Sequence, residues 1–399
     1  SDLFQGPGTL KTLDLARGAE VKTLVQMPDG VVRDPQLHFN GRRIVFALRR
    51  NADEDYHIWE INTDGTGLRQ LTRAQGVSDF DPIYLPDDSI VFSSTREPKY
   101  NMCSRDSAAN LFRMEADGAN IHQITKNTLF DNHSELMRDG RILYARWEYV
   151  DRNFGDAHGL WTVNPDGTNQ AIYWGNNTAV PGAVFNAHEI PGSQQIICVL
   201  GPHHDRLWGA LAIIDRRLGL DGRRPVIRTW PEDAINVIRA GGAFDCDLYT
   251  RQVRLKYEDP WPLSDKYFLC SRMIGQGEQT GIYLLDVFGN ELLLHTEAPG
   301  CYDPMPVKAS LRPLTMAARR EFDARPGHFY VADVYQGTHM AGVKRGAVKG
   351  LRVVESPEKR HWSRRSWNGQ GYTAPAMHWH SLESKRILGT VPVALHGSA

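Results

Sequence analysis

The repeat of this chain is clearest in the stretch DPIYLPDDSIVFSS at positions 81–94, which continues after a gap as NLFRMEADGANIHQIT at positions 110–125. Short apolar runs alternate there with Asp-Pro or Asp-Gly pairs, and such pairs favour tight turns between strands. Copies of the pattern return at intervals of roughly 40 to 55 residues, a period typical of propeller blades. One such unit cannot bury its own apolar face, but units packed around an axis share cores and protect their sheet edges.

The sequence therefore predicts an all-β fold, a six-bladed β-propeller with a short C-terminal β extension. The expected blades lie near 33–72, 79–125, 132–174, 182–230, 257–296 and 301–355. Two strands at 9–25 are expected to close the ring against the sixth blade. The alternative is a seventh blade, built from residues 361–399 together with these N-terminal strands.

The domain prediction is a propeller over residues 9–356 and a C-terminal extension over 357–399. Residues 385–393, KRILGTVPV, are typical of the first strand of a further β-domain, so we expect the native chain to continue past Ala399. At the other end, residues 3–7 read LFQGP, which matches a protease site used in cloning, so residues 1–8 are expected not to be native.

Composition excludes several classes of protein. Lys and Arg number 46 against 47 Asp and Glu, a formal net charge of −1, which lacks the basic footprint of a nucleic-acid-binding protein. No apolar run reaches the length of a membrane span. The five cysteines include no Cys-x-x-Cys pair, so neither a zinc ribbon nor covalently attached haem is expected in this chain.

Three histidines are the candidate metal ligands. His38, His133 and His188 follow the Asp-Pro turns or their equivalents, on strands that face the axis of a propeller. Converging imidazoles can bind a divalent transition metal. The alternative is that these are hydrogen-bonded histidines at strand ends.

The candidate catalytic residues are His203, His204, Asp205 and Arg206, on the long connection between the first two strands of the fourth repeat. Adjacent imidazole, carboxylate and guanidinium groups can act as base, orienting group and anion clamp. Alternatively, Asp205 and Arg206 pair with each other and only fix the loop.

The candidate binding residues lie in insertions at the same topological position of the second and third repeats. They are Cys103 and Arg105 in one insertion and Asp151 and Arg152 in the next. Because these insertions and the 203–206 loop leave equivalent places in consecutive blades, we expect them to share one face and one depression. Arg105 would favour the thiolate of Cys103, although a plain loop thiol is the alternative.

Several strings outside the repeat resemble proteins related to the hydrazine synthase alpha subunit. The matching strings lie at 92–100, 110–114, 146–156, 208–217 and 385–393, and the repeat itself resembles TolB-type periplasmic propellers. The resemblance implies a periplasmic or secreted protein whose propeller precedes a haem-carrying domain. Two departures stand out: the string at 101–109 keeps Cys103 but contains no His, and His203 stands where the family has Cys.

Three functions follow as hypotheses. The first is a scaffold and partial active-site wall for a redox centre, with haem or metal supplied by a downstream domain or partner subunit, as part of an oxidoreductase. The second is a lyase or hydrolase acting on anionic glycans. For this reading, Gln370, His378 and His380 resemble the manganese site of oligogalacturonate lyases. The third is a non-enzymatic interaction propeller. A downstream Cys-x-x-Cys-His motif would support the redox scaffold. Bound metal together with activity on uronate polymers would support the glycan lyase or hydrolase.

Overall fold

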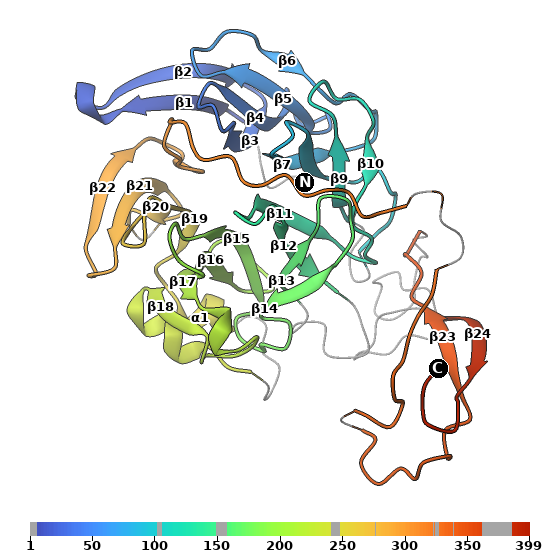
Figure 1. Cartoon of the computed structure of the whole chain (residues 1–399). Helices are drawn as coiled ribbons and strands as arrows, with labels where there is room; N and C mark the ends of the chain where they lie inside the picture. Colours follow the sequence, from blue (N-terminus) through green and yellow to red (C-terminus); the bar gives the residue numbers. More distant parts are fainter. Residues whose placement is uncertain are drawn as a thin grey trace.

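The computed structural model describes residues 6–101, 106–148, 158–240, 248–275, 277–321, 323, 327–337, 339–360 and 385–399. Within these residues the chain forms five antiparallel sheets of four strands each, arranged around a common axis, and two separate two-stranded sheets (Figure 1). The first strands of neighbouring blades contact one another and surround the axis. The architecture is a β-propeller.

The five blades take their strands in chain order. They are β3 (Val31–Leu37), β4 (Arg43–Arg49), β5 (His57–Asn62) and β6 (Arg69–Gln70); β7 (Asp79–Tyr84), β8 (Ile90–Ser94), β9 (Asn110–Met114) and β10 (His122–Gln123); β11 (Asp131–Leu136), β12 (Ile142–Trp147), β13 (His158–Val163) and β14 (Ala171–Trp174); β15 (Ala183–Glu189), β16 (Ile196–Gly201), β17 (Ala210–Ile214) and β18 (Val226–Trp230); and β19 (Tyr257–Pro262), β20 (Tyr267–Met273), β21 (Thr280–Asp286) and β22 (Glu291–Thr296). Short 3-10 turns at Leu15–Arg17, Arg216–Leu218 and Glu232–Val237 and one helix, α1 (Leu248–Gln252), connect them.

The first four blades each pack against apolar cores on both of their faces. In β8, Ile90 and Phe92 pack toward the first blade, whereas Val91 between them packs toward the third. Successive side chains of a strand point to opposite faces of the sheet, so a continuous apolar run serves two cores. This explains why the repeat reads as short apolar runs rather than as alternating polar and apolar residues.

In the first three blades, the Asp-Gly pairs at 64–65, 117–118 and 166–167 lie in the turns between the third and fourth strands. Gly118 and Gly167 have positive φ angles of 90° and 86°. A Cβ at Gly118 would lie 2.4 Å from the carbonyl oxygen of Leu71, and one at Gly167 would lie 2.4 Å from that of Ile124. Glycine is therefore required twice over, by the backbone conformation and by the close approach of the preceding blade.

The predicted number of blades is wrong. The structure has five blades, not six or seven. The described residues between β22 and β23 (Gly350–Glu355) contain no strand, and Pro299, Pro304, Pro306 and Pro313 remove main-chain donors that a sheet would need. The apolar residues expected in the sixth blade do not pack either, since Phe329 and Tyr330 are 88% and 82% exposed.

The N-terminal hairpin therefore packs on the first blade. Strands β1 (Gly8–Asp14) and β2 (Glu20–Met27) pair only with each other, and Leu10 and Val25 join the core around Ile44 and Phe46. Lys11 forms an ion pair with Glu297, which follows the last strand of the fifth blade. The hairpin thus lies between the two ends of the ring.

Residues 308–321 cross one face of the propeller as an extended strap, seen in orange in Figure 1. The strap contacts three blades at their turns: Ser310 N–H donates to the carbonyl of Phe39 at 3.0 Å, and Arg312 Nη1 donates to the carbonyl of Pro86 at 2.6 Å. The main-chain N–H groups of Arg319 and Arg320 both donate to the Asp166 carboxylate in the third blade.

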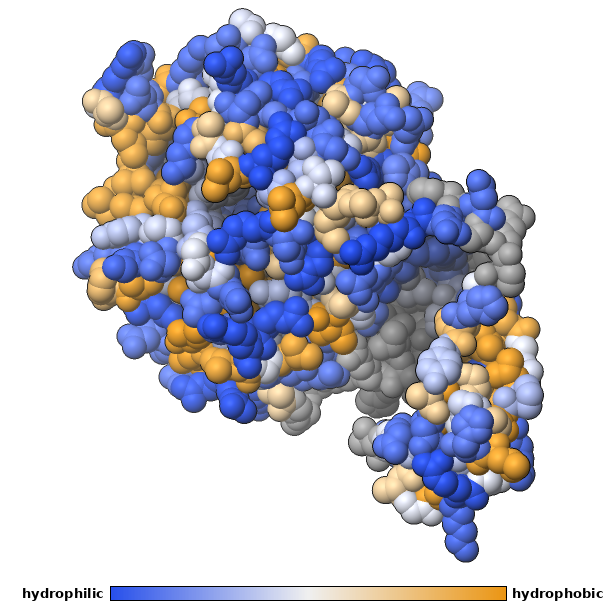
Figure 2. Space-filling view, viewed as in Figure 1, coloured by the Kyte–Doolittle hydropathy of each residue, from blue (hydrophilic) through white to orange (hydrophobic). Residues whose placement is uncertain are grey.

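Strands β23 and β24 (Arg386–Pro392) form a two-stranded antiparallel sheet that lies apart from the propeller (Figures 1 and 2). All seven residues of β24 are exposed, including Ile387 and Leu388 at 56% and 58%. None of the helices in the described segments is long and apolar enough to cross a membrane.

Candidate functional site

The axis of the propeller is built from one unusual backbone position in each repeat. Asp34, Asp81, His133, Asn186, Asp259 and Asp303 all have φ angles between 44° and 53°, in the left-handed region. The first five lie at β-bulges, where the register of the blade's first strand shifts. Asp, Asn and His tolerate this conformation better than other side chains. We call these six residues the axial ring.

Hydrogen bonds join members of the axial ring across blade boundaries. The N–H of Asp81 donates to Asp34 Oδ2 at 3.1 Å, and the N–H of His133 donates to Asp81 Oδ2 at 3.0 Å. Asp259 accepts from Asn186 Nδ2 at 2.7 Å and from the N–H of Asp303 at 3.1 Å. The carboxylates thus hold neighbouring blades in register around the axis.

The axial ring lines a central cavity of about 1970 Å³, which extends outward between β1 and the fifth blade. Burial and the nearby carboxylates of Asp259 and Asp34 raise the pKa of Asp303 well above its ordinary value. Burial, with the charge of Asp259, raises the pKa of Glu258 to about 8. The cavity wall therefore includes a carboxyl group, that of Glu258, which retains a proton near neutral pH.

The predicted catalytic loop divides between two environments. Arg206 Nη2 donates to Glu258 Oε1 at 2.6 Å, and its guanidinium lies over the rings of Trp208 and Tyr302. Asp205 lines the same central cavity and accepts a hydrogen bond from the N–H of Arg206 at 2.8 Å. Arg206 and Asp205 therefore belong to the wall of the central cavity.

His203 and His204 point to a different place, a cluster of aromatic and imidazole rings between the third and fourth blades. The ring of His203 makes edge contacts with Trp147 and His204, each at 4.7 Å between centroids. Trp147 in turn stacks on His158 at 5.8 Å. Burial, followed by the nearby His203 and His133, lowers the pKa of His158 well below its ordinary value. This imidazole is uncharged at neutral pH.

The three predicted metal ligands each face a different carboxylate. His38 Nε2 lies 2.7 Å from Asp88, and its Nδ1 accepts the N–H of Asn40 at 3.2 Å. The Nδ1 atoms of His133 and His188 lie 3.8 Å from Asp81 and 3.4 Å from Glu135.

No group of three or more His, Cys, Asp or Glu side chains in the described segments is arranged to hold a metal ion. His38, His133 and His188 do not fit a shared ion, so we derive no chemistry from one. The divalent metal stays a prediction, to be checked by elemental analysis of the purified protein.

Cys103, Arg105, Asp151 and Arg152 lie outside the described residues, as do Gln370, His378 and His380. The insertions that contain the first four do leave their sheets at matching places. Ser94 pairs with Asn110, Trp147 with His158, and Leu200 with Ala210, so all three connections start at the same end of their blades. Whether the four side chains share a depression stays a prediction.

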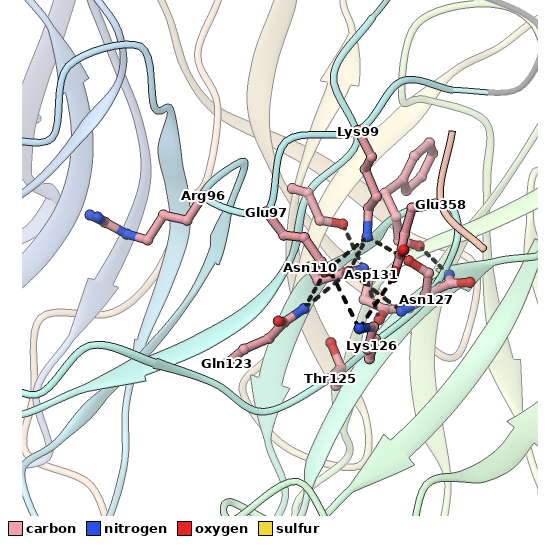
Figure 3. A network of polar contacts seen from close by, with 12 residues as sticks. Arg96, Glu97, Lys99, Asn110, Gln123, Thr125, Lys126, Asn127, Asp131 and Glu358 are labelled. Carbon is pink, nitrogen blue, oxygen red and sulfur yellow. Dashed lines mark hydrogen bonds and ion pairs between the residues drawn. The ribbon is translucent and has the colours of Figure 1, made fainter. Parts of the chain in front are cut away.

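A buried polar network lies at the base of the first insertion (Figure 3). The side chain of Lys99 is fully buried, and its Nζ donates to Asn110 Oδ1 and to the carbonyl of Asn127. Asn127 Nδ2 donates to Asp131 at 3.2 Å, which joins the second blade to the third. Burial lowers the pKa of Lys99.

The same network also holds Glu358 and Lys359, at the end of the described segment 339–360. Glu358 Oε1 lies 3.3 Å from Lys126 Nζ, and the N–H of Tyr100 donates to the carbonyl of Lys359 at 2.8 Å. Every charged group in this network has a partner in the fold. We therefore assign it a structural role, fixing the C-terminal segment to the insertion side of the propeller.

Several residues of the candidate site were missed from the sequence. The carboxyl groups of Asp259 and Asp303 belong to the Asp-Pro pairs that marked the repeat, and they were interpreted only as turn residues. Glu258 directly precedes one of these pairs. For His158 the sequence offered only a weaker indication of a site, namely its position as the first residue after an insertion.

Comparison with known proteins agrees with this architecture. No known family model matches the chain. A curated relative, hydrazine synthase subunit alpha of Kuenenia stuttgartiensis, is 24% identical over 240 residues, which cover 45% of this chain and 29% of the relative. The solved structure of Kuenenia stuttgartiensis hydrazine synthase superposes with a TM-score of 0.70 at 18% identity, covering 99% of this chain and 60% of that one. The chain resembles the hydrazine synthase alpha subunit.

The match at the level of structure spans almost the whole chain, whereas the chain spans under two thirds of either relative. A TolB-like propeller from Agrobacterium tumefaciens also matches, at 10% identity and a TM-score of 0.47 over 73% of this chain. The resemblance to the hydrazine synthase alpha subunit expected from the sequence is confirmed.

Proposed function

We propose that this chain is the propeller scaffold of a redox enzyme similar to hydrazine synthase. In this proposal, the central cavity and the 203–206 loop form one wall of an active site that another domain or subunit completes. The redox cofactor, haem or metal, would belong to that domain or subunit, and the whole protein would be periplasmic or secreted.

The observation that carries this proposal is the exposed two-stranded sheet of β23 and β24. A two-stranded sheet alone is at best marginally stable in water. This sheet projects from the propeller (Figure 2). Its apolar side chains are exposed: 46% for Val354, 56% for Ile387, 58% for Leu388 and 40% for Val391. An apolar sheet of this kind gains stability when a further domain or subunit covers it.

The geometry of the cavity wall supports the second part of the proposal. Arg206 supplies a fixed positive charge, and Glu258 supplies a carboxyl group whose pKa, raised to about 8, suits proton transfer near neutral pH. Such a wall can bind a small polar substrate and exchange a proton with it. The glycan-lyase and interaction-propeller hypotheses stay untested predictions.

The experiment is isolation of the tagged protein from the cells that make it. We expect a stoichiometric partner or a covalently continuous domain, with a haem or metal absorption spectrum. The variant Leu388→Asp should lose the partner, or expose the domain to protease, whereas Phe288→Asp should not. Phe288 is a matched control because it is apolar and 70% exposed but lies in the fifth blade.

Arg206→Ala should keep the assembly intact and lower its turnover by about tenfold or more, because the raised-pKa carboxyl of Glu258 would lose its guanidinium partner. A tagged protein that purifies as a single propeller without any redox cofactor would contradict the proposal. So would an Arg206→Ala assembly with full activity.

A further inference from the structure

A small, partly open cavity lies between the third and fourth blades, apart from the central cavity. Its volume is about 90 Å³. Three aromatic rings, Phe130, Trp147 and Phe185, form much of its wall, and Asn132, His158, His203 and Asp205 add polar groups.

A polar atom of His158 and one of Asn132 in the cavity wall are buried and have no hydrogen-bond partner among the described residues. They are Nε2 of His158 and Oδ1 of Asn132. His158 as a whole is only 6% exposed. Buried polar groups in native proteins are nearly always hydrogen-bonded, so these two atoms indicate that something in the cavity bonds to them.

The chemistry of the wall limits what that occupant can be. Asn132 Oδ1 can only accept a hydrogen bond, so the occupant must carry a donor. The imidazole of His158 is uncharged, because burial lowers its pKa, so Nε2 can complete the pairing without adding charge.

The single carboxylate, Asp205, already accepts a hydrogen bond from the Arg206 N–H and lies near the Lys256 ammonium. Neither Asp205 nor His158 therefore offers an unbalanced charge to a ligand.

Size and shape limit the occupant further. A cavity of about 150 Å³ is known to hold benzene, so about 90 Å³ suits a molecule of roughly five non-hydrogen atoms or fewer. Aromatic walls favour a flat molecule, since rings stack face to face or edge to face.

The cavity also has a neighbour through which a ligand can arrive. Asp205 and Leu207 line both this cavity and the central one. A shift of these two side chains would connect them.

We propose that the cavity between the third and fourth blades binds a small, planar, uncharged molecule with an N–H donor, of the size of a primary amide or an azole. Asn132 Oδ1 accepts its N–H, His158 Nε2 forms the second hydrogen bond, and Phe130, Trp147 and Phe185 pack on its faces and edges. This site does not depend on a partner domain.

The test is binding of acetamide and of pyrazole to the whole chain, followed by saturation-transfer NMR and by crystal soaks. At least one probe should bind wild type with a Kd below about 10 mM. His158→Phe and Asn132→Leu keep roughly the same side-chain size but remove both ring nitrogens of the imidazole and both polar atoms of the amide, respectively. Each should weaken binding about tenfold or more, without lowering the melting temperature, because a buried unpaired polar atom is removed.

His122→Phe is the matched control, since His122 lies on a strand of the second blade far from the cavity in the fold, and it should bind both probes as wild type does. If one cavity variant fails to fold, the other still decides the question. Ordered water alone in the soaked cavity, or equal affinity in wild type and both cavity variants, would overturn the proposal.

Discussion

The main-chain N–H of Asp303 donates a hydrogen bond to Oδ2 of Asp259 at 3.1 Å, in the same way that the N–H of Asp81 bonds to Asp34. Asp303 thus continues the axial ring with the same backbone conformation, although no blade follows it. The Asp-Pro pair at 303–304 acts as an anchor for the chain as it leaves the ring and becomes the strap.

Replacing Asp259 should destabilise the propeller. Asp259 accepts hydrogen bonds from Asn186 Nδ2, Ser271 Oγ and the N–H of Asp303, and it has a φ angle of 50°. Asp259→Ala would leave three donors unpaired and place Ala in the left-handed region, so we expect a loss of about 3–5 kcal/mol in the free energy of unfolding. Urea denaturation measures it. Asp64→Ala, in an exposed turn of the first blade, should cost under about 1 kcal/mol, and equal losses would contradict this role.

Stability should fall as pH rises toward 8. The pKa of Glu258 is about 8 in the folded chain, against an ordinary value of 4.5. Between these values the folded protein keeps a proton that the unfolded chain releases, so the free energy of unfolding decreases by at most about 1.4 kcal/mol per pH unit for this group. Asp303 contributes in the same direction. Glu258→Gln should therefore flatten the decrease without abolishing it.

The measurement is urea unfolding at several pH values from about 5 to about 8. Glu54→Gln is the control, because the pKa of Glu54 is lowered by hydrogen bonding to Arg50 rather than raised. Its stability curve should run parallel to that of wild type in this range. A Glu258→Gln curve as steep as that of wild type would show that Glu258 is ionised in the folded protein.

Replacing the buried Lys99 should lower the free energy of unfolding far more than replacing the exposed Lys126. Lys99→Met would remove the donor shared by Asn110 and Asn127 and leave Glu97 and Asp131 with less positive charge nearby. Breaking a buried charged network in this way costs about 3–5 kcal/mol. Lys126→Met is the matched control: its side chain is 67% exposed, so we expect a loss of under about 1 kcal/mol in the same denaturation experiment. Similar losses would exclude the anchoring role.

The strap should loosen when its anchor in the third blade is removed. Only the Asp166 carboxylate, among the equivalent turn residues Asp64, Asp117 and Asp166, accepts main-chain N–H bonds from the strap in the described part of the chain. Asp166→Ala should speed tryptic cleavage after Arg319 and Arg320 by about threefold or more, because local opening precedes cleavage. Asp117→Ala should leave the rate unchanged. A slow rate in both variants would mean that the other contacts of the strap, such as those of Ser310 and Arg312, are sufficient to hold it.

The sequence by itself determined the propeller and the positions of its first five blades. Each blade begins and ends within about two residues of the expected bounds, because turn pairs such as Asp117-Gly118 and apolar runs such as Ile90–Phe92 act locally. The number of blades was not determined in this way. A closing blade depends on whether distant segments pair, and the described residues within 301–346 are mostly exposed and form no strand.

The site shows the same division. The sequence identified the 203–206 loop and the end of each blade at which the insertions leave. Only the tertiary structure decided that Arg206 faces Glu258 while His203 faces Trp147, that His38, His133 and His188 pair with separate carboxylates, and that Asp259 and Asp303 line one cavity. Hydrogen bonds and raised pKa values of this kind arise between residues of different blades. They depend on distances across the axis, which no local pattern in the chain encodes.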